Sequence, residues 1–574
     1  MDSIDNDVGG GGGEEDNDDN DRRDHQIRTR IKTTTISAFY NIILQTSLRC
    51  FSFIINAFIV RFVSKEILGI INVRLLLLYT TIQFLSREPI RRTCSPNSDS
   101  KCDRIYNANS KTWLSMLNIT FLSIPISTIF GMLISMIWYK VFKSPDDPLL
   151  HTQYCWAIMA VYVSVIIESF AESCYVFGQR YDYIRLKVFI EGLFQITRSL
   201  LFALIIFRYP DYSIYGFAIA QLISSILYSL LYYFYLLFIV KLPLETFLPV
   251  YIRKNQAISN NIDQNLIKTW CVFLKNSTLK QFLTEGERYI MTMFPLISFA
   301  EEGVFDIVNN LGSLPARLIF QPIEENGYLL FSSLVKRNVK IESQRNKIIQ
   351  SLEICSNLTK LMFLIGSLLF VYGYNNASLL LYIYGGPRFL SDQLSSLAIN
   401  LFRSHCVYIV LIAVNGILES YSFAVMSTNQ LNDFNKKMLM TSIIFVTSSL
   451  LITSLIGSVG FIVANCFNMI TRIIISLYFL GHLLPNHRIL HFLNESKPNP
   501  LTFVIYSLAF AILVIVRRMF LEPINDVITL FRAFSFILFN GFLLLIHLLL
   551  LYITESKLRY FLKKKIFYKS NKIN

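Results

Sequence analysis

Residues 212–240 read YSIYGFAIAQLISSILYSLLYYFYLLFIV and contain no charged side chain. A helix needs about 20 apolar residues to cross the hydrocarbon core of a bilayer. This stretch is long enough to do so, and it therefore predicts a membrane-spanning helix. Similar stretches follow one another in both directions along the chain.

The composition agrees with this interpretation. Of the 574 residues, 53% are hydrophobic and only 16% are charged, which excludes a soluble enzyme. The net charge of +14 does not indicate a nucleic-acid partner, because the basic residues are scattered between apolar runs instead of forming one basic face. The nine cysteines include no C-x-x-C pair and predict neither a zinc site nor a disulfide scaffold.

Fourteen apolar stretches alternate with short polar loops, and each predicts one transmembrane helix. The expected fold class is therefore an all-α polytopic membrane protein. The expected spans are 37–63, 66–86, 112–139, 152–177, 186–207, 212–240, 269–297, 303–333, 349–373, 399–426, 438–455, 459–480, 500–516 and 530–552.

The lysine and arginine residues fix the expected orientation. If the N terminus is cytoplasmic, the cytoplasmic segments hold about five times as many of these residues as the translocated loops. This distribution of basic residues predicts that both termini and the loop 87–111 are cytoplasmic, and that the loop 374–398 is translocated. The tail 1–36 begins with a Gly, Asp and Asn tract that has almost no apolar side chains, so we expect the tail to be disordered.

A weak internal repeat predicts two lobes. LGIINVRLLL at 68–77 and EGVFDIVNNLGSL at 302–314 align when Gly69 is placed on Gly303 and Asn72 on Asp306. Both copies open the second helix of a six-helix block, as expected for a transporter with parallel repeats. The expected units are an N-terminal lobe 37–240, a cytoplasmic linker 241–268, a C-terminal lobe 269–480, two further helices within 500–552 and a basic tail 553–574.

Charged residues inside the expected spans indicate a polar interior, since each costs about 2.5–3.5 kcal/mol at the bilayer centre. The eighth span has six polar residues in a stripe roughly 60° wide, and Pro315 and Pro322 should interrupt its helix. The stripe consists of Asp306, Asn310, Ser313, Arg317, Gln321 and Glu324. The seventh span has a comparable polar face that includes Lys280, Glu285, Glu287 and Arg288.

Two interpretations of these charges are possible. They could pair across helix interfaces and only stabilise the bundle. Because cations outnumber acids inside the spans, we instead expect a positive cavity that binds an anionic ligand, with guanidinium groups on phosphate oxygens. The cations at Arg61, Arg87 and Arg472 have no acid one helical turn away. Arg198 and Arg403 belong to the same set of intramembrane cations.

Several familiar motifs are missing from the sequence. It contains no G-x-x-x-x-G-K-[ST] and no H-E-x-x-H, so we expect no nucleotide-driven pump, no catalytic residues, no metal site and no cofactor. Asn376-Ala-Ser378 is a possible glycosylation acceptor in a translocated loop.

Five runs closely resemble the eukaryotic oligosaccharide translocation protein family of the endoplasmic reticulum, part of the multidrug, oligosaccharidyl-lipid and polysaccharide exporter superfamily. They are INAFIVRFVSKEILGIINVRLLLLY (55–79), FLSREPIRRTC (84–94), LKQFLTEGERYIMT (279–292), GVFDIVNNLGSLPARLIFQPIEE (303–325) and GSVGFIVANCFNMITR (457–472). The resemblance implies two six-helix lobes around a central cavity. It also implies movement of a mannose-rich oligosaccharide on dolichyl pyrophosphate from the cytoplasmic to the lumenal leaflet, before N-glycosylation.

The resemblance also suggests site residues. It places the family's cavity arginines on Arg61, Arg87, Arg317 and Arg472, and its TEGER segment on 284–288. Together with the polar faces, the candidate substrate-binding residues are Arg61, Arg87, Lys280, Glu285, Glu287, Arg288, Arg317, Glu324 and Arg472.

Other functions stay open at this point. A non-transporting accessory factor of the same pathway is compatible with every residue. A small-molecule antiporter of the same superfamily would use carboxylates rather than arginines for organic cations. A membrane glycosyltransferase would carry acidic residues in a long first lumenal loop, whereas here that loop is little more than 64–66.

Overall fold

The computed structural model describes residues 47–48, 50–94, 111–181, 183–248, 264–335, 337, 339, 341–391, 393–483, 488–520 and 530–563. These residues form helices and connecting turns, with no β-strand among them. The expected disordered tail 1–36 lies outside the described residues, as do residues 249–263 of the linker and residues 564–574 of the basic tail.

Eleven of the described helices are long and apolar enough to cross a membrane, and the helix Cys50–Phe62 is a shorter apolar one. The chain is therefore a multi-pass helical membrane protein, as the composition predicted. Helices also cover the expected seventh and eighth spans, but there they are interrupted and carry charged residues. The count of fourteen spans stays a prediction.

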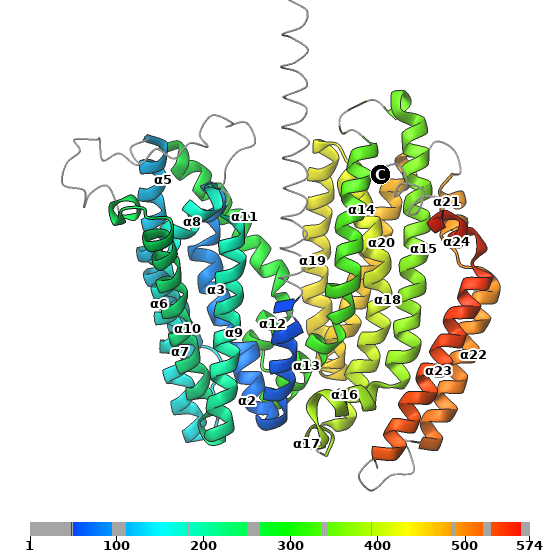
Figure 1. Ribbon diagram of the computed structural model, residues 1–574, viewed down its shortest axis with the longest axis horizontal. Helices are drawn as coiled ribbons and strands as arrows, with labels where there is room; N and C mark the ends of the chain where they lie inside the picture. The colour runs from blue at the N-terminus through cyan, green and yellow to red at the C-terminus, as the bar shows by residue number, and fades with distance from the viewer. Residues whose placement is uncertain are drawn as a thin grey trace, which may run out of the picture.

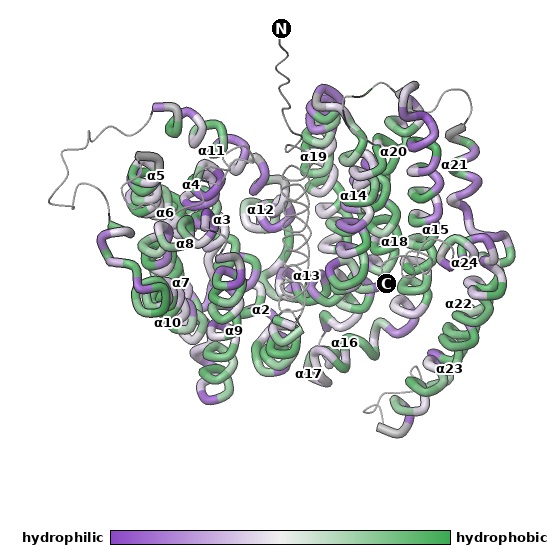
Figure 2. The backbone as a smooth tube through the Cα atoms, turned by 45° about the horizontal axis from the view of Figure 1, so that its top comes forward, coloured by the Kyte–Doolittle hydropathy of each residue, from purple (hydrophilic) through white to green (hydrophobic). Residues whose placement is uncertain are grey.

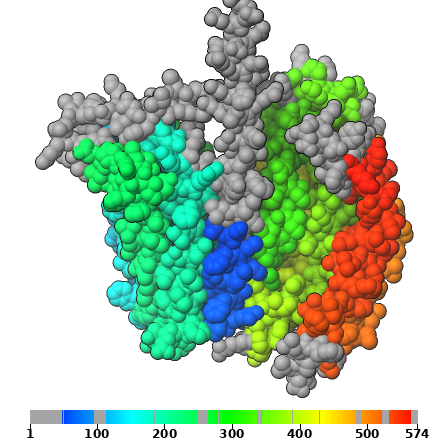
Figure 3. Space-filling model, viewed as in Figure 1, coloured from blue at the N-terminus to red at the C-terminus, as the bar shows by residue number. Residues whose placement is uncertain are grey.

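The helices form two bundles that stand side by side (Figure 1). The first lobe begins with the helix Cys50–Phe62, which Figure 3 shows in blue between the two bundles. Its other elements are α2 Lys65–Gly69, η1 Ile70–Leu75, α3 Leu76–Ser86, α4 Glu88–Thr93, α5 Lys111–Phe121, α6 Ser123–Lys140, α7 Pro148–Ser169, α8 Glu172–Arg180, α9 Ile184–Arg208, η2 Pro210–Tyr212, α10 Ser213–Phe234, η3 Tyr235–Ile239 and η4 Leu244–Phe247.

The second lobe follows, and its first helix crosses to the other bundle, because α11 packs against α3 and α4 of the first lobe. The elements of the second lobe are α11 Gln264–Thr284, α12 Gly286–Met293, α13 Phe299–Gly312, η6 Ala316–Phe320, α14 Gln321–Leu334, η7 Ile341–Gln344, α15 Arg345–Asn375, α16 Ala377–Gly385, α17 Pro387–Leu390, α18 Ser395–Val425, α19 Thr428–Ile456, α20 Val459–Leu483 and α21 Arg488–Ser496.

The eighth expected span is broken where the prolines predicted it. A turn at Ser313 ends α13, and the π-helix η6 follows Pro315. Pro322 then lies where η6 runs directly into α14, so its missing amide hydrogen falls at the change from π-helix to α-helix. The predicted interruption is therefore confirmed, and it divides the polar stripe between three helical segments.

A C-terminal pair lies along the outer face of the second lobe and consists of α22 Pro500–Phe520 and α23 Leu530–Thr554, followed by the short α24 Ser556–Leu562. Both long helices of the pair are hydrophobic over most of their length (Figure 2). Lys360 of α15 forms a buried ion pair with Glu555, which follows α23, and the Nζ–Oε2 distance is 2.8 Å. This contact connects the two C-terminal helices to the second lobe. Asn376, the possible glycosylation acceptor, donates its side-chain amide to Asn540 Oδ1 of α23 at 3.0 Å. Its glycosylation stays a prediction.

The lobes are held together where α2 and α13 cross. Each helix starts at a serine N-cap, Ser64 or Ser298, and each has a glycine five residues later. A Cβ atom at Gly69 would lie 2.0 Å from the Phe299 carbonyl oxygen, and one at Gly303 would lie 1.9 Å from that of Lys65. Both helix backbones therefore come so close that only glycine fits at the crossing.

The two halves of this contact correspond to each other under the alignment that places Gly69 on Gly303. That alignment also matches Ser64 with Ser298 and residue 65 with residue 299. Equivalent residues of the two copies thus touch one another, which is the geometry of a two-fold, self-complementary interface. The weak sequence repeat is a structural repeat at this point.

Candidate ligand-binding site

A polar cluster lies next to the glycine crossing, one helical turn further along. Asn72 Nδ2 of η1 donates to Asp306 Oδ2 of α13 at 3.0 Å, and these two residues are again equivalent in the repeat. The buried Asp306 carboxylate also accepts from Asn310 Nδ2 at 3.2 Å and from Arg288 Nη2 at 3.0 Å. Arg288 further donates to Glu285 Oε2 at 3.1 Å. The cluster thus connects η1 of the first lobe and α13 of the second lobe with the turn between α11 and α12.

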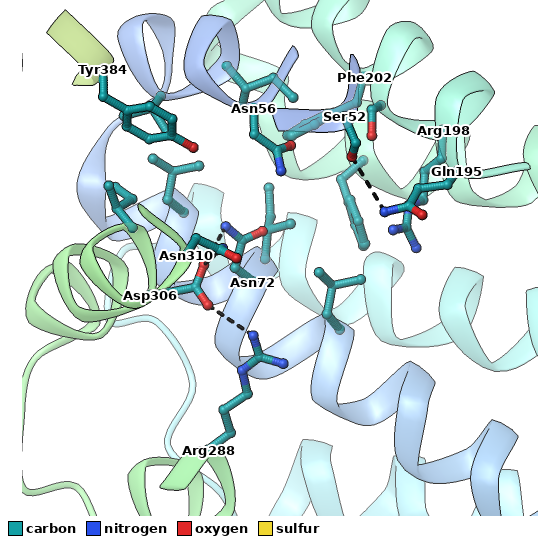
Figure 4. Close-up of a pocket in the computed structure, with 18 residues that line it drawn as sticks. Ser52, Asn56, Asn72, Gln195, Arg198, Phe202, Arg288, Asp306, Asn310 and Tyr384 are labelled. Atoms are coloured by element: carbon teal, nitrogen blue, oxygen red, sulfur yellow. Dashed lines mark hydrogen bonds and ion pairs between the residues drawn. The ribbon is translucent and has the colours of Figure 1, made fainter. Parts of the chain in front are cut away.

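A cavity of about 200 Å³ opens on this cluster. Figure 4 shows Gln195 and Arg198 of α9 on one side of it, Asp306 and Asn310 of α13 on the other, and Arg288 of α12 below them. Gln195 Nε2 donates to the hydroxyl of Ser52 at 3.4 Å. The lining therefore offers several amide and hydroxyl groups. Its other polar members are Asn56, Asn72, Ser199 and Tyr384.

The Arg198 guanidinium is the cation on the far side of this first cavity. Its Nη1 donates to Gln221 Oε1 at 3.3 Å, and its carbon lies 5.5 Å from the centre of the Phe194 ring. Among the described residues no carboxylate lies within ion-pair distance of it. Arg198 is thus a positively charged group, only partly exposed, that forms no ion pair with a carboxylate in the described part of the chain.

A second cavity of about 210 Å³ adjoins the first and shares Arg288 and Asp306 with it. Its lining also includes Glu285 and Glu287, and the Glu287 carboxylate accepts a hydrogen bond from the Asn465 side chain of α20. Three carboxylates therefore face one guanidinium. The expectation of a positive cavity is wrong for this second cavity, because its three acids outnumber its single arginine.

Three of the candidate residues from the sequence line these cavities: Glu285, Glu287 and Arg288. The other six lie elsewhere. Lys280 is an exposed residue of α11. Glu324 packs its carboxylate against α18, where a Cβ atom at Gly416 would lie 1.7 Å from Glu324 Oε1.

Arg61 and Arg317 both donate to backbone carbonyls at helix ends. Arg61 Nη2 donates to the carbonyl of Ile383, and its Nε donates to that of Tyr384 at 3.4 Å; both carbonyls belong to the last turn of α16. Arg317 Nη2 donates at 2.8 Å to the carbonyl of Asn310, in the last turn of α13. Such contacts satisfy carbonyl groups that have no partner within their own helix.

Arg87 is buried inside the first lobe, with 1% of its side chain exposed. Its guanidinium contacts Glu168 Oε2 at 2.6 Å, Glu172 Oε2 at 2.7 Å and the Tyr228 hydroxyl at 3.0 Å. Arg91 adds a second guanidinium on Glu172 at 2.5 Å. The sequence showed no acid one turn from Arg87, and the partners come instead from α7 and α8.

Arg472 is paired in the second lobe. Its Nη2 donates to Glu419 Oε2 of α18 at 2.6 Å, and Asn415 Nδ2 donates to the same carboxylate oxygen at 2.8 Å. Arg87 and Arg472 thus follow the alternative in which intramembrane charges pair across helices. Their role in ligand binding stays a prediction.

Sequence reasoning missed Arg198 as a site residue, although it was among the intramembrane cations. Nothing in the sequence around Arg198 distinguishes it from Arg403 or Arg74, because the distinction lies in which helices supply acids to each. Asn72 and Asp306 had a detectable signal. Both occupy equivalent positions of the repeat, and a polar residue at both copies of one position suggests a contact on the symmetry axis.

Comparison with known proteins identifies the family. A model of the Rft protein family matches residues 33–565. The chain belongs to the Rft protein family. It is 37% identical over 453 residues to the Man(5)GlcNAc(2)-PP-dolichol translocation protein RFT1 of Mus musculus. The alignment covers 77% of this chain and 80% of the mouse protein. The chain is 35% identical over 490 residues to the RFT1 of Drosophila melanogaster, with 79% and 86% coverage.

Solved structures place this Rft family member in a known architecture. The lipid II flippase MurJ in an inward closed conformation superimposes with a TM-score of 0.56 at 14% identity, over 90% of this chain and 99% of MurJ. An inward-facing multidrug resistance MATE family transporter of the MOP superfamily superimposes with a TM-score of 0.53 at 11% identity, over 77% and 98%. At these identities the likeness concerns the fold alone, and it agrees with two lobes of transporter type.

Proposed function

We propose that this chain moves a dolichyl-pyrophosphate-linked, mannose-rich oligosaccharide from the cytoplasmic to the lumenal leaflet of the endoplasmic reticulum membrane, for protein N-glycosylation. The observation that supports this most is a polar cavity between two membrane-embedded lobes, in a chain whose relatives are named as Man(5)GlcNAc(2)-PP-dolichol translocation proteins. A polar interior in a bilayer is costly and is usually functional.

The chemistry of the cavities suits the two parts of such a head group. Amide and hydroxyl side chains such as Asn56, Asn72 and Gln195 can exchange hydrogen bonds with sugar hydroxyls. Guanidinium groups bind phosphate oxygens in a planar, two-pronged geometry. The polyprenyl chain needs no protein site, because it can remain in the lipid.

The size of the cavities sets a further condition. Pockets for drug-sized ligands measure about 300–1,000 Å³, whereas the first cavity measures about 200 Å³. A heptasaccharide cannot fit there as the lobes now stand. The lobes must separate to admit it, and the exposed Lys280 and Arg317 would then meet parts of the glycan outside the two cavities.

The expected topology gives the crossing a mechanical role. With both termini cytoplasmic, the loop 63–64 before α2 faces the lumen, so the contact of Gly69 with Gly303 closes the lumenal side. Rocking of the lobes about this contact would open the cavity to each side in turn. No nucleotide-binding motif is present in the sequence, so we propose that the movement needs no ATP.

An accessory role without transport is the second candidate, and one observation favours it. Arg74, Arg87 and Arg472 are each bound to a carboxylate, so much of the intramembrane charge has an internal structural partner. A scaffold would need nothing more. This alternative leaves unexplained the cavity and its Arg198, which forms no ion pair with a carboxylate among the described residues.

Sealed microsomes from cells that lack the endogenous relative offer a test. An impermeant glycosidase added outside should digest the mannose-rich lipid-linked oligosaccharide in the depleted membranes, because it stays on the cytoplasmic leaflet. Expression of this chain should restore the protected, lumenal fraction. An equal protected fraction with and without the chain, at equal oligosaccharide levels, would contradict the proposed function.

A further inference from the structure

We propose that Arg198 binds the pyrophosphate group of the ligand, and that Arg87 keeps Arg198 available by neutralising Glu168. The inference deepens the proposed function and rests on it for the identity of the ligand. It assigns Arg87 a positioning role inside the first lobe rather than contact with the head group.

The charges of the two cavities decide where an anion can bind. Arg288 lies between Asp306 and Glu285, so its charge is already neutralised, and Glu287 makes that region negative. Arg198 lies on the opposite wall with no carboxylate in ion-pair contact within the described part of the chain. An anion is therefore repelled from the second cavity and attracted to the Arg198 side of the first one.

The neutral groups around Arg198 suit a ligand that is both anionic and rich in hydroxyls. Gln195 lies one helical turn before Arg198, and Ser199 follows it directly, so α9 presents an amide and a hydroxyl beside the guanidinium. Asn72 and Asn310 lie on the opposite wall with the acidic cluster. This places phosphate oxygens against α9, and sugar hydroxyls against the amides and carboxylates of the opposite wall.

A chain of hydrogen bonds joins Arg198 to the buried interior of the first lobe. Arg198 donates to Gln221, Gln221 Nε2 donates to the Ser225 hydroxyl at 3.4 Å, and Ser225 donates to Glu168 Oε1 at 2.8 Å. Glu168 is thus an acid near Arg198, held at a distance by two intervening side chains. Its carboxylate is instead in direct contact with Arg87.

Removing Arg87 would change this balance. Glu172 would still be bound by Arg91, but Glu168 would lose the one cation among the described residues that contacts it. An unpaired buried carboxylate is strongly unfavourable and attracts the nearest available cation. That cation is Arg198, whose movement toward Glu168 would withdraw it from the cavity. Loss of Arg87 should therefore weaken ligand binding although Arg87 does not line either cavity.

Binding measurements on the purified full-length chain test both parts. The probes are dolichyl pyrophosphate, inorganic pyrophosphate and uncharged dolichol, and melting temperatures show whether each variant is folded. We expect Arg198→Gln to weaken dolichyl pyrophosphate binding at least tenfold and to leave dolichol unaffected. The matched control is Arg208→Gln at the exposed end of the same helix, which should stay within twofold of the unchanged chain.

Double variants test the role of Arg87. Arg87→Gln should weaken the binding of dolichyl pyrophosphate. Adding Glu168→Gln to it should restore the affinity to within threefold of the unchanged chain. Adding Glu168→Gln to Arg198→Gln should not restore it. Glu168→Gln alone, which does not depend on the folding of Arg87→Gln, should bind at least as tightly as the unchanged chain. A tenfold loss in folded Glu168→Gln would overturn the competition between the two arginines.

The probes separate this inference from the proposed function. Unchanged binding of both pyrophosphates by folded Arg198→Gln would overturn the anion site and leave the proposed function untouched. Binding of inorganic pyrophosphate that depends on Arg198, without binding of dolichyl pyrophosphate, would support the anion site and contradict the proposed function.

Discussion

Gly69 and Gly303 face each other where α2 and α13 cross, and the backbone of each helix fills the space that a Cβ atom on the other would need. The two glycines occupy the same position in the two copies of the repeat. Next to them, the equivalent residues Asn72 and Asp306 are joined by a hydrogen bond. The interface between the lobes thus lies on the pseudo-two-fold axis, with the first cavity beside it.

Alanine at either glycine should force the two helices apart. The added Cβ would lie about 2 Å from a backbone oxygen that cannot rotate away, and overpacking of this kind costs about 1–3 kcal/mol. We expect Gly69→Ala and Gly303→Ala to lower the melting temperature of the purified protein. Gly541→Ala in α23 is the control, because nothing lies within 4 Å of its added Cβ. Equal melting temperatures for all three variants would rule out the close contact between the α2 and α13 backbones.

The ion pair between Arg74 and Glu302 should stabilise the same junction. Both side chains are buried and meet at 2.6 Å, and loss of one partner from such a pair costs about 3–5 kcal/mol. We expect Arg74→Met to reduce protein abundance severely, and Arg74→Met with Glu302→Leu to recover much of it. The partly exposed pair of Arg92 with Glu88 provides the contrast, since Arg92→Met should cost no more than about 1 kcal/mol. Similar abundance for Arg74→Met and Arg92→Met would refute this role.

Arg61 should affect the fold more than the ligand. It donates to carbonyls at the end of α16 and lies outside both cavities. We expect Arg61→Gln to destabilise the protein by about 0.5–1.5 kcal/mol, the usual net value of a hydrogen bond, while dolichyl pyrophosphate affinity stays within twofold. A folded Arg61→Gln variant with tenfold weaker binding would instead support the sequence-based prediction that Arg61 contacts the head group.

The orientation of the helices can be checked with single cysteines in a chain whose native cysteines are replaced. Ser64 and Lys436 are both exposed, and the distribution of basic residues places the loops around them on opposite sides of the membrane. Ser64→Cys should react with an impermeant maleimide only after the lumen is opened. Lys436→Cys should react from the cytoplasmic side in sealed microsomes. Reaction of both cysteines from the same side would show that the predicted orientation of the helices is wrong.

The sequence was sufficient for the helical class, the two lobes and the break at Pro315, because apolar length, repetition and proline each act locally. The repeat aligned the two glycines of the crossing, but it did not predict that they meet. The pairing of the buried arginines was not accessible in the same way. A search for acids one turn along the same helix finds none for Arg87, whereas the partners Glu168 and Glu172 lie on α7 and α8.

The same lack of information about contacts between helices explains why most of the candidate site residues do not line the two cavities. An intramembrane arginine can bind a ligand, cap a helix or pair with an acid, and the sequence around it looks alike in the three cases. In the structure Arg61 contacts carbonyls at a helix end and Arg87 pairs with an acid, whereas Arg198 lines a cavity. Only the arrangement of the helices distinguishes them.

Transbilayer movement in liposomes tests the central claim most directly. The purified chain is reconstituted without nucleotide into vesicles that contain the dolichyl-pyrophosphate-linked heptasaccharide in both leaflets, and an impermeant glycosidase is added outside. The account predicts that digestion proceeds beyond the outer-leaflet half at a rate that rises with protein content and falls in Arg198→Gln. Digestion that stops at the same half as in protein-free vesicles, with folded protein present, would contradict it and favour the accessory role.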